Sequence, residues 1–516
     1  MQLQHLNPAF VTPLKSCSRT KRALFLHCVL LILLGSEQYG AYSRKLLLKL
    51  AISLDAPVWV LSNDEIRFAS ASSKIIRGIP IEEILQRRAE ESKPGMRRFR
   101  SQMNSATLGG ENAGKLAAPL AASRIGTVFA GYGLQPAATT ALIGPLNEST
   151  VAIGTLFGLY GARQGSKSME AHGKDVLDLA MIPLHLPYNP GLIDPKDVPT
   201  DSRKLRVTIA VSGLLTSNQD LRESWNFLGQ QNEVYVMRWE LEALSKMGTS
   251  FEILGKSLAW DEAKKEITSR TVFDRLRDSL WPYSLMKISK IIDQPWTIGM
   301  TRAEKAGQVL ADTIMNKMYG ERPISLAGYS FGARVIYVCM MILAEKRAFG
   351  LLENVILIGA PCPADIPCWV SLRSVCVGRL INVFSPQDYL LGFLHRSSAW
   401  MYGVAGLQEI MGVPNVENFN ASHFAASHLR YHYLVGTILK KLNWEDVDYQ
   451  QVALQQDKLN ELIDIEDNFV ASRIQQRDAK AKQAAQEEAK EQPEEQGLQD
   501  VTNKFRRTNL GPERRR

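Results

Sequence analysis

The chain has 516 residues and a formal net charge of +8; 45% of its residues are hydrophobic and 22% are charged. This composition excludes collagen-like and globally disordered proteins. The chain is longer than the size at which a single hydrophobic core stops growing, so we expect two or more structural units. Part of the positive charge is the terminal run Arg514-Arg515-Arg516, typical of a solvated tail, so we expect no nucleic-acid partner. The six cysteines are spread too thinly for a disulfide framework or a metal site, which favours free or buried thiols in a reducing compartment.

Residues 1–114 are predicted to form an N-terminal helical region. An apolar run at 23–34 follows two basic residues, as in a signal peptide, but it is too short to span a bilayer comfortably and lacks a clear cleavage site. The next segment, 43–54, places leucines at helical spacing. A buried pair of helices is therefore predicted here, and a further helix with a polar face is predicted at 81–91.

Between residues 115 and 163 the chain becomes rich in Gly and Ala and nearly free of charge. The stretch 125–147 is long enough to cross a membrane, and its small residues would let helices approach closely in lipid. Pro136 and Pro145 would kink such helices. Two interpretations stay open: a hairpin that inserts into or lies against a membrane, and a close-packed soluble helical hairpin.

Short apolar runs alternate with helix-length patterns from residue 205 to residue 445. Continuous apolar strands that alternate with helices indicate a mostly parallel sheet with helices on both faces, which is an α/β fold. The pattern predicts six strands, at 205–213, 232–239, 323–332, 354–361, 379–388 and 415–422.

The segments on either side of this α/β domain have a different composition. Residues 164–204 are rich in Pro and Gly and are predicted to form a linker. Residues 446–516 become rich in Ala, Glu, Lys and Gln, with little to bury, and are predicted to form a polar helical or disordered tail. A short coiled coil would fit the start of this tail, although no heptad is sustained.

The five residues Gly328-Tyr329-Ser330-Phe331-Gly332 fit the pattern G-x-S-x-G of a nucleophile elbow. They follow an apolar strand and precede a long apolar helix, which is the strand–turn–helix setting that an elbow requires. A serine in an ordinary tight turn is the plainer alternative. Ser330 is the candidate nucleophile.

A serine hydroxyl needs a base and a carboxylate, which follow in the order Ser, Asp, His in this kind of hydrolase. Asp388 ends the second strand after the elbow, where a carboxylate can orient an imidazole. Its plainer role is a helix cap, and Asp365 is an alternative acid. His423 and His428 both lie in the loop after the last predicted strand, and spacing does not separate them.

An oxyanion hole would use backbone N–H groups near the nucleophile. One is expected from Phe331, directly after Ser330. The other is expected from Leu214 or Leu215, in the turn after the first strand, which Gly213 permits.

At these residues the chain resembles the family of transmembrane and coiled-coil domain-containing protein 4, over most of residues 25–445. The resemblance rests on VTIAVSGLLT, TRAEKAGQVLA, RPISLAGYSFGARVI, LLENVILIGAP, GRLINVFSPQDYLLGFLHR and VENFNASHFAASHLRY. It implies an α/β-hydrolase fold, a triad of Ser330, Asp388 and His428, and membrane association through the glycine-rich segment. The family pattern has Gly-His followed by Tyr, so Ser427 before His428 is a small departure, and Tyr431 matches.

The expected function is that of a membrane-associated, intracellular serine hydrolase that acts on an ester or acyl lipid, at the cytoplasmic face of an organelle membrane, without metal or cofactor. Segment 278–296 would form a cap, where Trp281, Tyr283 and Trp296 suit an acyl chain, although simple packing is the plainer role for these aromatics. The alternative function, from another class, is a catalytically silent hydrolase-fold scaffold that docks proteins at a membrane, for example in trafficking.

Overall fold

The structure is a computed structural model of the whole chain. It describes residues 7–36, 39–76, 136–143, 150–158, 176–186, 198–199, 202–255, 283–398, 403–424 and 428–465, and scattered single residues up to 482. The chain divides into two compact units, Met1–Ala453 and Leu454–Arg516. In the second unit, residues 454–465 are helical. The sheet and the candidate site belong to the first unit.

A seven-stranded sheet has the order β1-β3-β2-β4-β5-β6-β7. Its strands are β1 (Ala180–Pro183), β2 (Val207–Val211), β3 (Glu233–Arg238), β4 (Ile324–Tyr329), β5 (Leu352–Ile358), β6 (Leu380–Phe384) and β7 (Val416–Asn420). All neighbouring strands are parallel except β1 and β3, which are antiparallel. Every residue of β2, β4 and β6 is buried, as expected for parallel strands covered on both faces.

The mostly parallel sheet and all six predicted strands are confirmed, with boundaries within a few residues. The linker predicted over 164–204 is corrected in one place, because strand β1 lies within it and pairs with β3 at the edge of the sheet. The compact unit also continues past the predicted boundary at 445, to Ala453. There the Asp446 carboxylate accepts the backbone N–H of Gln231 at 2.7 Å, which ties this segment to the turn before β3.

Seven helices accompany the sheet in the described part of the α/β domain. They are α11 (Asp220–Glu223), α12 (Leu241–Gly255), α14 (Tyr283–Met315), α15 (Phe331–Glu345), α16 (Ile366–Val375), α17 (Tyr389–Ser398) and α18 (Tyr431–Lys441). Helix α15 starts directly after β4 and packs against both α14 and α16. The elbow is therefore held between a buried strand and a buried helix.

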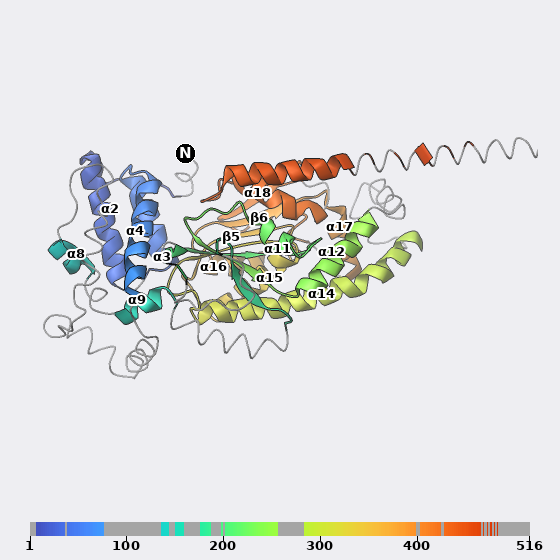
Figure 1. Cartoon of the computed structure of the whole chain (residues 1–516), viewed down its shortest axis with the longest axis horizontal. Coiled ribbons are helices and arrows are strands. Elements are labelled where there is room, and N and C mark those ends of the chain that lie inside the picture. Colours follow the sequence, from blue (N-terminus) through green and yellow to red (C-terminus); the bar gives the residue numbers. More distant parts are fainter. Residues whose placement is uncertain are drawn as a thin grey trace, which may run out of the picture. The chain divides into compact units, whose positions relative to one another are not determined.

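The described part of the N-terminal region, residues 7–36 and 39–76, is largely helical, and Figure 1 shows its helices side by side. A short turn η1 (Pro13–Ser16) precedes α2 (Arg19–Gly35), α3 (Ala41–Ser53) and α4 (Val58–Ile76). Helix α2 begins where the Ser18 side chain accepts the N–H of Lys21. Leu26, Leu47 and Phe68 belong to a common core, which confirms the predicted buried helix pair.

The described parts of the segment 115–163 also join this core. They are α8 (Pro136–Ile143) and α9 (Thr150–Leu156), and they bury Ile143 and Ile153 against the N-terminal helices. The other residues of this segment, and the helix predicted at 81–91, lie outside the described residues. Within the described ranges, every helix is too short or too polar to cross a lipid bilayer.

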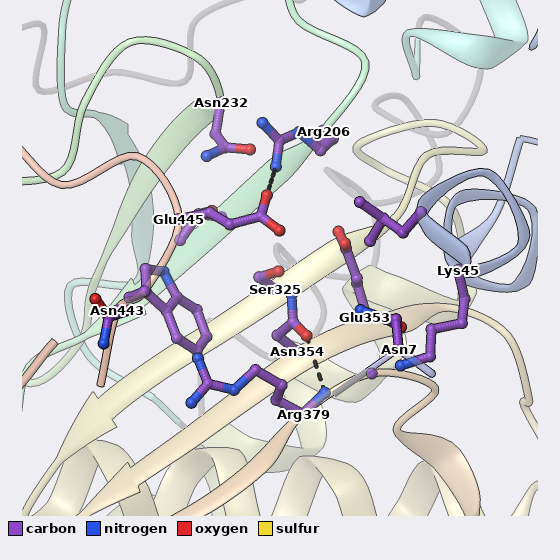
Figure 2. Close-up of a pocket in the computed structure, with 14 residues that line it drawn as sticks. Asn7, Lys45, Arg206, Asn232, Ser325, Glu353, Asn354, Arg379, Asn443 and Glu445 are labelled. Carbon is purple, nitrogen blue, oxygen red and sulfur yellow. Dashed lines mark hydrogen bonds and ion pairs between the residues drawn. The ribbon is translucent and has the colours of Figure 1, made fainter. Parts of the chain in front are cut away.

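A buried ionic network joins α3 and α4 to the amino-terminal edge of the sheet. Arg44 is fully buried and pairs with Glu65, with Glu353 of β5 and with Glu445 after α18. Glu445 also pairs with Arg206, which precedes β2, at 2.6 Å. Figure 2 shows the polar pocket that this network borders, whose lining includes Lys45, Ser325, Asn354 and Arg379. None of the predicted catalytic or oxyanion residues lines it.

Candidate active site

Ser330 occupies the turn between β4 and α15 with a backbone conformation that few residues adopt. Its φ is 54° and its ψ is −127°, a strained combination for a residue with a side chain. The turn is held by a hydrogen bond from the Ser330 N–H to the carbonyl of Ile358, at 2.9 Å. A strained serine between a strand and a helix is the geometry of a nucleophile elbow.

Gly332, two residues after Ser330, allows a close contact between α15 and β2. A Cβ atom on Gly332 would lie 2.0 Å from the carbonyl oxygen of Val211, the last residue of β2. A side chain there would push the helix away from the strand. The second glycine of the G-x-S-x-G pattern is thus required by packing around the elbow.

Two hydrogen bonds connect the three side chains of the predicted triad. The hydroxyl of Ser330 lies 2.7 Å from Nε2 of His428, and Nδ1 of His428 lies 2.6 Å from Oδ2 of Asp388. All three residues are buried. Because a carboxylate only accepts hydrogen bonds, Nδ1 carries the proton and Nε2 is left to accept the Ser330 hydroxyl.

The Asp388 carboxylate makes two contacts, one to the start of a helix and one to the imidazole. It lies between β6 and α17, and its Oδ1 accepts the backbone N–H of Leu391 at 3.0 Å, as a helix cap does. Its Oδ2 accepts the imidazole of His428. The helix start therefore fixes the orientation of the carboxylate that holds the imidazole.

The alternative residues lie elsewhere. His423 is exposed, and Asp365 is exposed at the start of α16, where it accepts the Cys368 thiol. Two further histidines follow Asp388 in the chain, His395 on α17 and His432 on α18, and both are buried. Burial lowers the pKa of His395 to about 4 and also lowers the pKa of His432. Of the histidines considered from sequence, the structure brings only His428 to Ser330.

Gly213, which precedes the predicted oxyanion residues Leu214 and Leu215, lies against the elbow. A Cβ atom on Gly213 would lie 2.7 Å from Cβ of Ser330 and 2.8 Å from the backbone nitrogen of Phe331, so a side chain there would obstruct that N–H. Leu214 and Leu215 follow and are buried. Among the described residues, the N–H groups of Phe331, Leu214 and Leu215 have no hydrogen-bond acceptor. Such donors are suited to a substrate oxygen.

Sequence reasoning alone did not assign a role to Tyr431, which lies against the imidazole. The rings of His428 and Tyr431 meet edge to face, with centroids 5.3 Å apart and an interplanar angle of 87°. The Tyr431 hydroxyl has no hydrogen-bond partner among the described residues. Burial, and then the negative charge of Asp388, raise the pKa of this phenol well above its usual value. The three-residue spacing from His428, one helical turn, is the signal that points to this contact.

An aromatic cluster contains Phe331, the residue directly after Ser330. Trp296 of α14 is fully buried, 4.5 Å from the ring of Phe331 and 6.4 Å from that of Phe251. Trp296 therefore packs in the core, which is the plainer of its two predicted roles. The side chains of Trp281 and Tyr283 lie outside the described residues.

The arrangement has the parts needed for nucleophilic attack on a carbonyl group. It offers a hydroxyl that donates to an imidazole, a carboxylate that holds this imidazole, and the N–H of Phe331 beside the nucleophile, which has no acceptor among the described residues. Among the described residues, no group of His, Cys, Asp and Glu is arranged as a metal site.

Comparison with known proteins finds relatives named for membranes and one named for lipid hydrolysis. The uncharacterized membrane protein C6F6.13c of Schizosaccharomyces pombe is 33% identical over 455 residues, which are 85% of this chain and 75% of that protein. The protein named "Probable lipase MIL1" of Saccharomyces cerevisiae is 32% identical over 309 residues, 59% of this chain and 27% of that protein. The rice transmembrane and coiled-coil domain-containing protein STS1 is 31% identical over 295 residues, 57% of this chain and 43% of that protein.

The match thus covers less than half of the Saccharomyces cerevisiae protein and less than half of the rice protein. No solved structure matches the chain. A family model described as "Protein of unknown function (DUF726)" matches residues 96–445, which is more than half of the chain and includes the whole candidate site. The chain belongs to this family, DUF726.

Proposed function

We propose that the chain is a serine hydrolase of the α/β-hydrolase fold that acts on a carboxylic ester. Ser330 is the nucleophile, His428 the general base, and Asp388 the group that orients the imidazole. The observation that carries the proposal is the pair of hydrogen bonds, 2.7 Å and 2.6 Å long, that ends on a serine in a strained elbow. The chain order Ser, Asp, His agrees with this fold.

The reaction follows from the positions of these atoms. Oγ of Ser330 attacks the acyl carbon while its proton passes to Nε2 of His428, and Asp388 stabilises the resulting imidazolium. The carbonyl oxygen gains negative charge and accepts hydrogen bonds from the N–H of Phe331 and of Leu214 or Leu215. The proton on His428 then goes to the leaving alcohol. Water repeats the sequence on the acyl-serine and releases the carboxylic acid.

Within the family we place the chain with transmembrane and coiled-coil domain-containing protein 4, and we propose an acyl lipid as the substrate class. Two names support this choice: one relative is named a probable lipase, and another is named a membrane protein. We accordingly propose that the protein works at an intracellular membrane, on its cytoplasmic face. The reaction uses no metal or organic cofactor.

A second candidate function is a catalytically silent scaffold that docks proteins at membranes. One observation favours it: only 1% of Ser330 is exposed, so its side chain has almost no contact with solvent in this conformation. A hydrolase with this geometry must open before it reacts. A scaffold would keep the same closed site without consequence.

A fluorophosphonate probe distinguishes the two functions, because it reacts covalently only with an activated serine. The full chain would be treated with the probe with and without detergent or liposomes, which favour an open site. Labelling is expected in the wild type, absent in Ser330→Ala and sharply reduced in His428→Ala. Ser325→Ala, which alters a buried serine at the opposite edge of the sheet, is the control and should label normally. No labelling of a folded wild type under any condition would support the scaffold.

The substrate class is tested next, with esters of increasing acyl length and with phospholipid and neutral-lipid esters. Hydrolysis that depends on Ser330 and increases with acyl length would support a lipid substrate. Ser330-dependent activity limited to short, soluble esters would contradict the lipid assignment while leaving the hydrolase assignment in place.

A further inference from the structure

Large apolar side chains are exposed at one end of the N-terminal helices. Phe10 is 47% exposed, Val11 is 103% exposed and Leu14 is 38% exposed, all before α2. Trp59, in the first turn of α4, is 49% exposed. Exposed basic side chains accompany them. We name this surface the bundle tip, and its residues are Phe10, Val11, Leu14, Lys15, Arg19, Lys21 and Trp59.

Specific contacts bring these segments to the same end of the helices. The N–H of Phe10 donates to the Ser53 side chain, at the last turn of α3, over 3.0 Å. The guanidinium of Arg22, in the first turn of α2, donates to the carbonyl of Leu54. The start of α2, the end of α3 and the start of α4 therefore meet at the bundle tip, and the residues before α2 lie across it.

The bundle tip carries more positive than negative charge among the described residues. The described residues 7–36 and 39–76 contain three acidic side chains, of which Asp64 and Glu65 are buried. The third, Asp55, is exposed and faces Arg22 at 3.7 Å. Lys15, Arg19 and Lys21 remain exposed. The surface thus combines exposed aromatic and aliphatic side chains with a net positive charge.

We propose that the bundle tip docks on an anionic lipid surface, with Val11, Leu14 and Trp59 in the interfacial region and the basic side chains at the headgroups. Tryptophan and aliphatic residues flanked by Lys and Arg are suited to this interface. Each basic side chain adds attraction to an anionic leaflet that a neutral membrane does not supply. This assigns membrane contact to a described surface outside the segment 115–163, and it rests on the membrane association in the proposed function.

The bundle tip and the candidate active site are separate in the fold. The first turn of α3 contacts the amino-terminal edge of the sheet, where the Ala41 N–H donates to the carbonyl of Gly350 at 3.0 Å. The bundle tip lies at the other end of α3, whereas Ser330 lies at the carboxyl end of β4. The two can therefore be measured separately, with probe labelling in detergent reporting on Ser330 and vesicle flotation reporting on the bundle tip.

Flotation of the full chain with vesicles tests the docking. Wild type would be mixed with phosphatidylcholine vesicles and with phosphatidylcholine–phosphatidylserine vesicles, at low and high salt. The test variant is Val11→Asp with Leu14→Asp. The control is Ile253→Asp with Met411→Asp, which makes the same charge change at apolar residues that are 68% and 74% exposed on the α/β domain. A second variant, Lys15→Glu with Lys21→Glu, tests the charge alone.

We expect wild type and control to float with anionic vesicles, and both tip variants to partition at least about tenfold less. High salt should reduce binding. All variants should retain probe labelling of Ser330, which separates a failed tip from a failed hydrolase. The proposal would be overturned if the tip and control variants lost vesicle binding equally, or if the tip variants floated as well as wild type. It would also be overturned if wild type did not bind the vesicles. So would a wild type that self-associates through this surface, detected by light scattering and abolished by Val11→Asp.

Discussion

The Oδ2 atom of Asp388 lies 2.6 Å from Nδ1 of His428, while Oδ1 of the same carboxylate accepts the N–H of Leu391. Both oxygens are therefore committed, one to the start of α17 and one to the imidazole. A carboxylate fixed in this way leaves the imidazole little freedom to rotate. The base thus faces Ser330 before any substrate arrives.

The first prediction is that Asp388→Asn keeps the fold but loses reactivity. The amide oxygen can still accept the N–H of Leu391, so the helix cap survives. The amide NH₂ then faces Nδ1 of His428 and favours the wrong tautomer, as in other Ser-His-Asp hydrolases, where this change costs about 10⁴-fold. The rate of fluorophosphonate labelling should fall by about 10³-fold or more. Asp365→Asn, at the start of α16, is the matched control; a labelling rate no lower in Asp388→Asn than in this control contradicts the assigned role.

The second prediction separates the ring of Tyr431 from its hydroxyl. The buried hydroxyl has no hydrogen-bond partner among the described residues, so Tyr431→Phe should leave stability and labelling nearly unchanged. Tyr431→Ala removes the ring that lies edge-on to His428 and should cost about 3–5 kcal/mol of unfolding free energy, with slower labelling. Urea unfolding and labelling rates measure both effects. If Tyr431→Phe were as damaging as Tyr431→Ala, the hydroxyl itself would be needed, which contradicts the prediction.

Strands β2 to β6 could be predicted because each is an apolar run that is mostly buried, whereas β7 (VENFN) lies at the edge of the sheet and has no buried residue. Strand β1 could not, since it has only four residues, ends in Pro183 and pairs at the edge of the sheet. The ionic network could not be predicted either. Arg44 and Glu445 are 401 residues apart, and nothing in the local sequence of either residue specifies the other.

The candidate site was predictable where it depends on local structure. The elbow around Ser330 is encoded in five consecutive residues, and Asp388 is placed by the end of a strand. The choice between His423 and His428 depends on the path of the loop after β7, which spacing does not determine. The close approach of Gly213 to Ser330 depends on the adjacency of β2 and β4, which is a property of the strand order.

The third prediction concerns the packing around the elbow. In Gly332→Ala the new methyl group would meet the carbonyl oxygen of Val211, so the start of α15 must shift. Overpacking of this kind should lower the unfolding free energy by about 1–3 kcal/mol and slow labelling, because the N–H of Phe331 moves with the helix. Phe331→Leu is the comparison: it loses packing against Trp296 but keeps the backbone, and should still label. Normal labelling of a stable Gly332→Ala protein would show that the elbow tolerates the shift.

The fourth prediction is a pH dependence of stability set by Glu445. Burial opposes its ionisation, but Arg44 and Arg206 outweigh burial and lower the pKa of Glu445 to about 2. In the unfolded chain the pKa of this carboxyl lies near its ordinary value of 4.5. The folded pKa is the lower one, so the stabilisation is complete above about pH 5 and is lost as the pH falls toward 2.

Glu445→Gln should therefore lower the unfolding free energy by about 2–3 kcal/mol at about pH 7, and by less than half of that at about pH 3. Urea unfolding of wild type and variant at both pH values measures the difference. Glu242→Gln, which alters an exposed ion pair with Lys246, should behave like wild type at both. A difference between wild type and Glu445→Gln that stays constant from neutral to acid pH would mean that the charge of Glu445 does not stabilise the fold, and that the ionic network acts through packing instead.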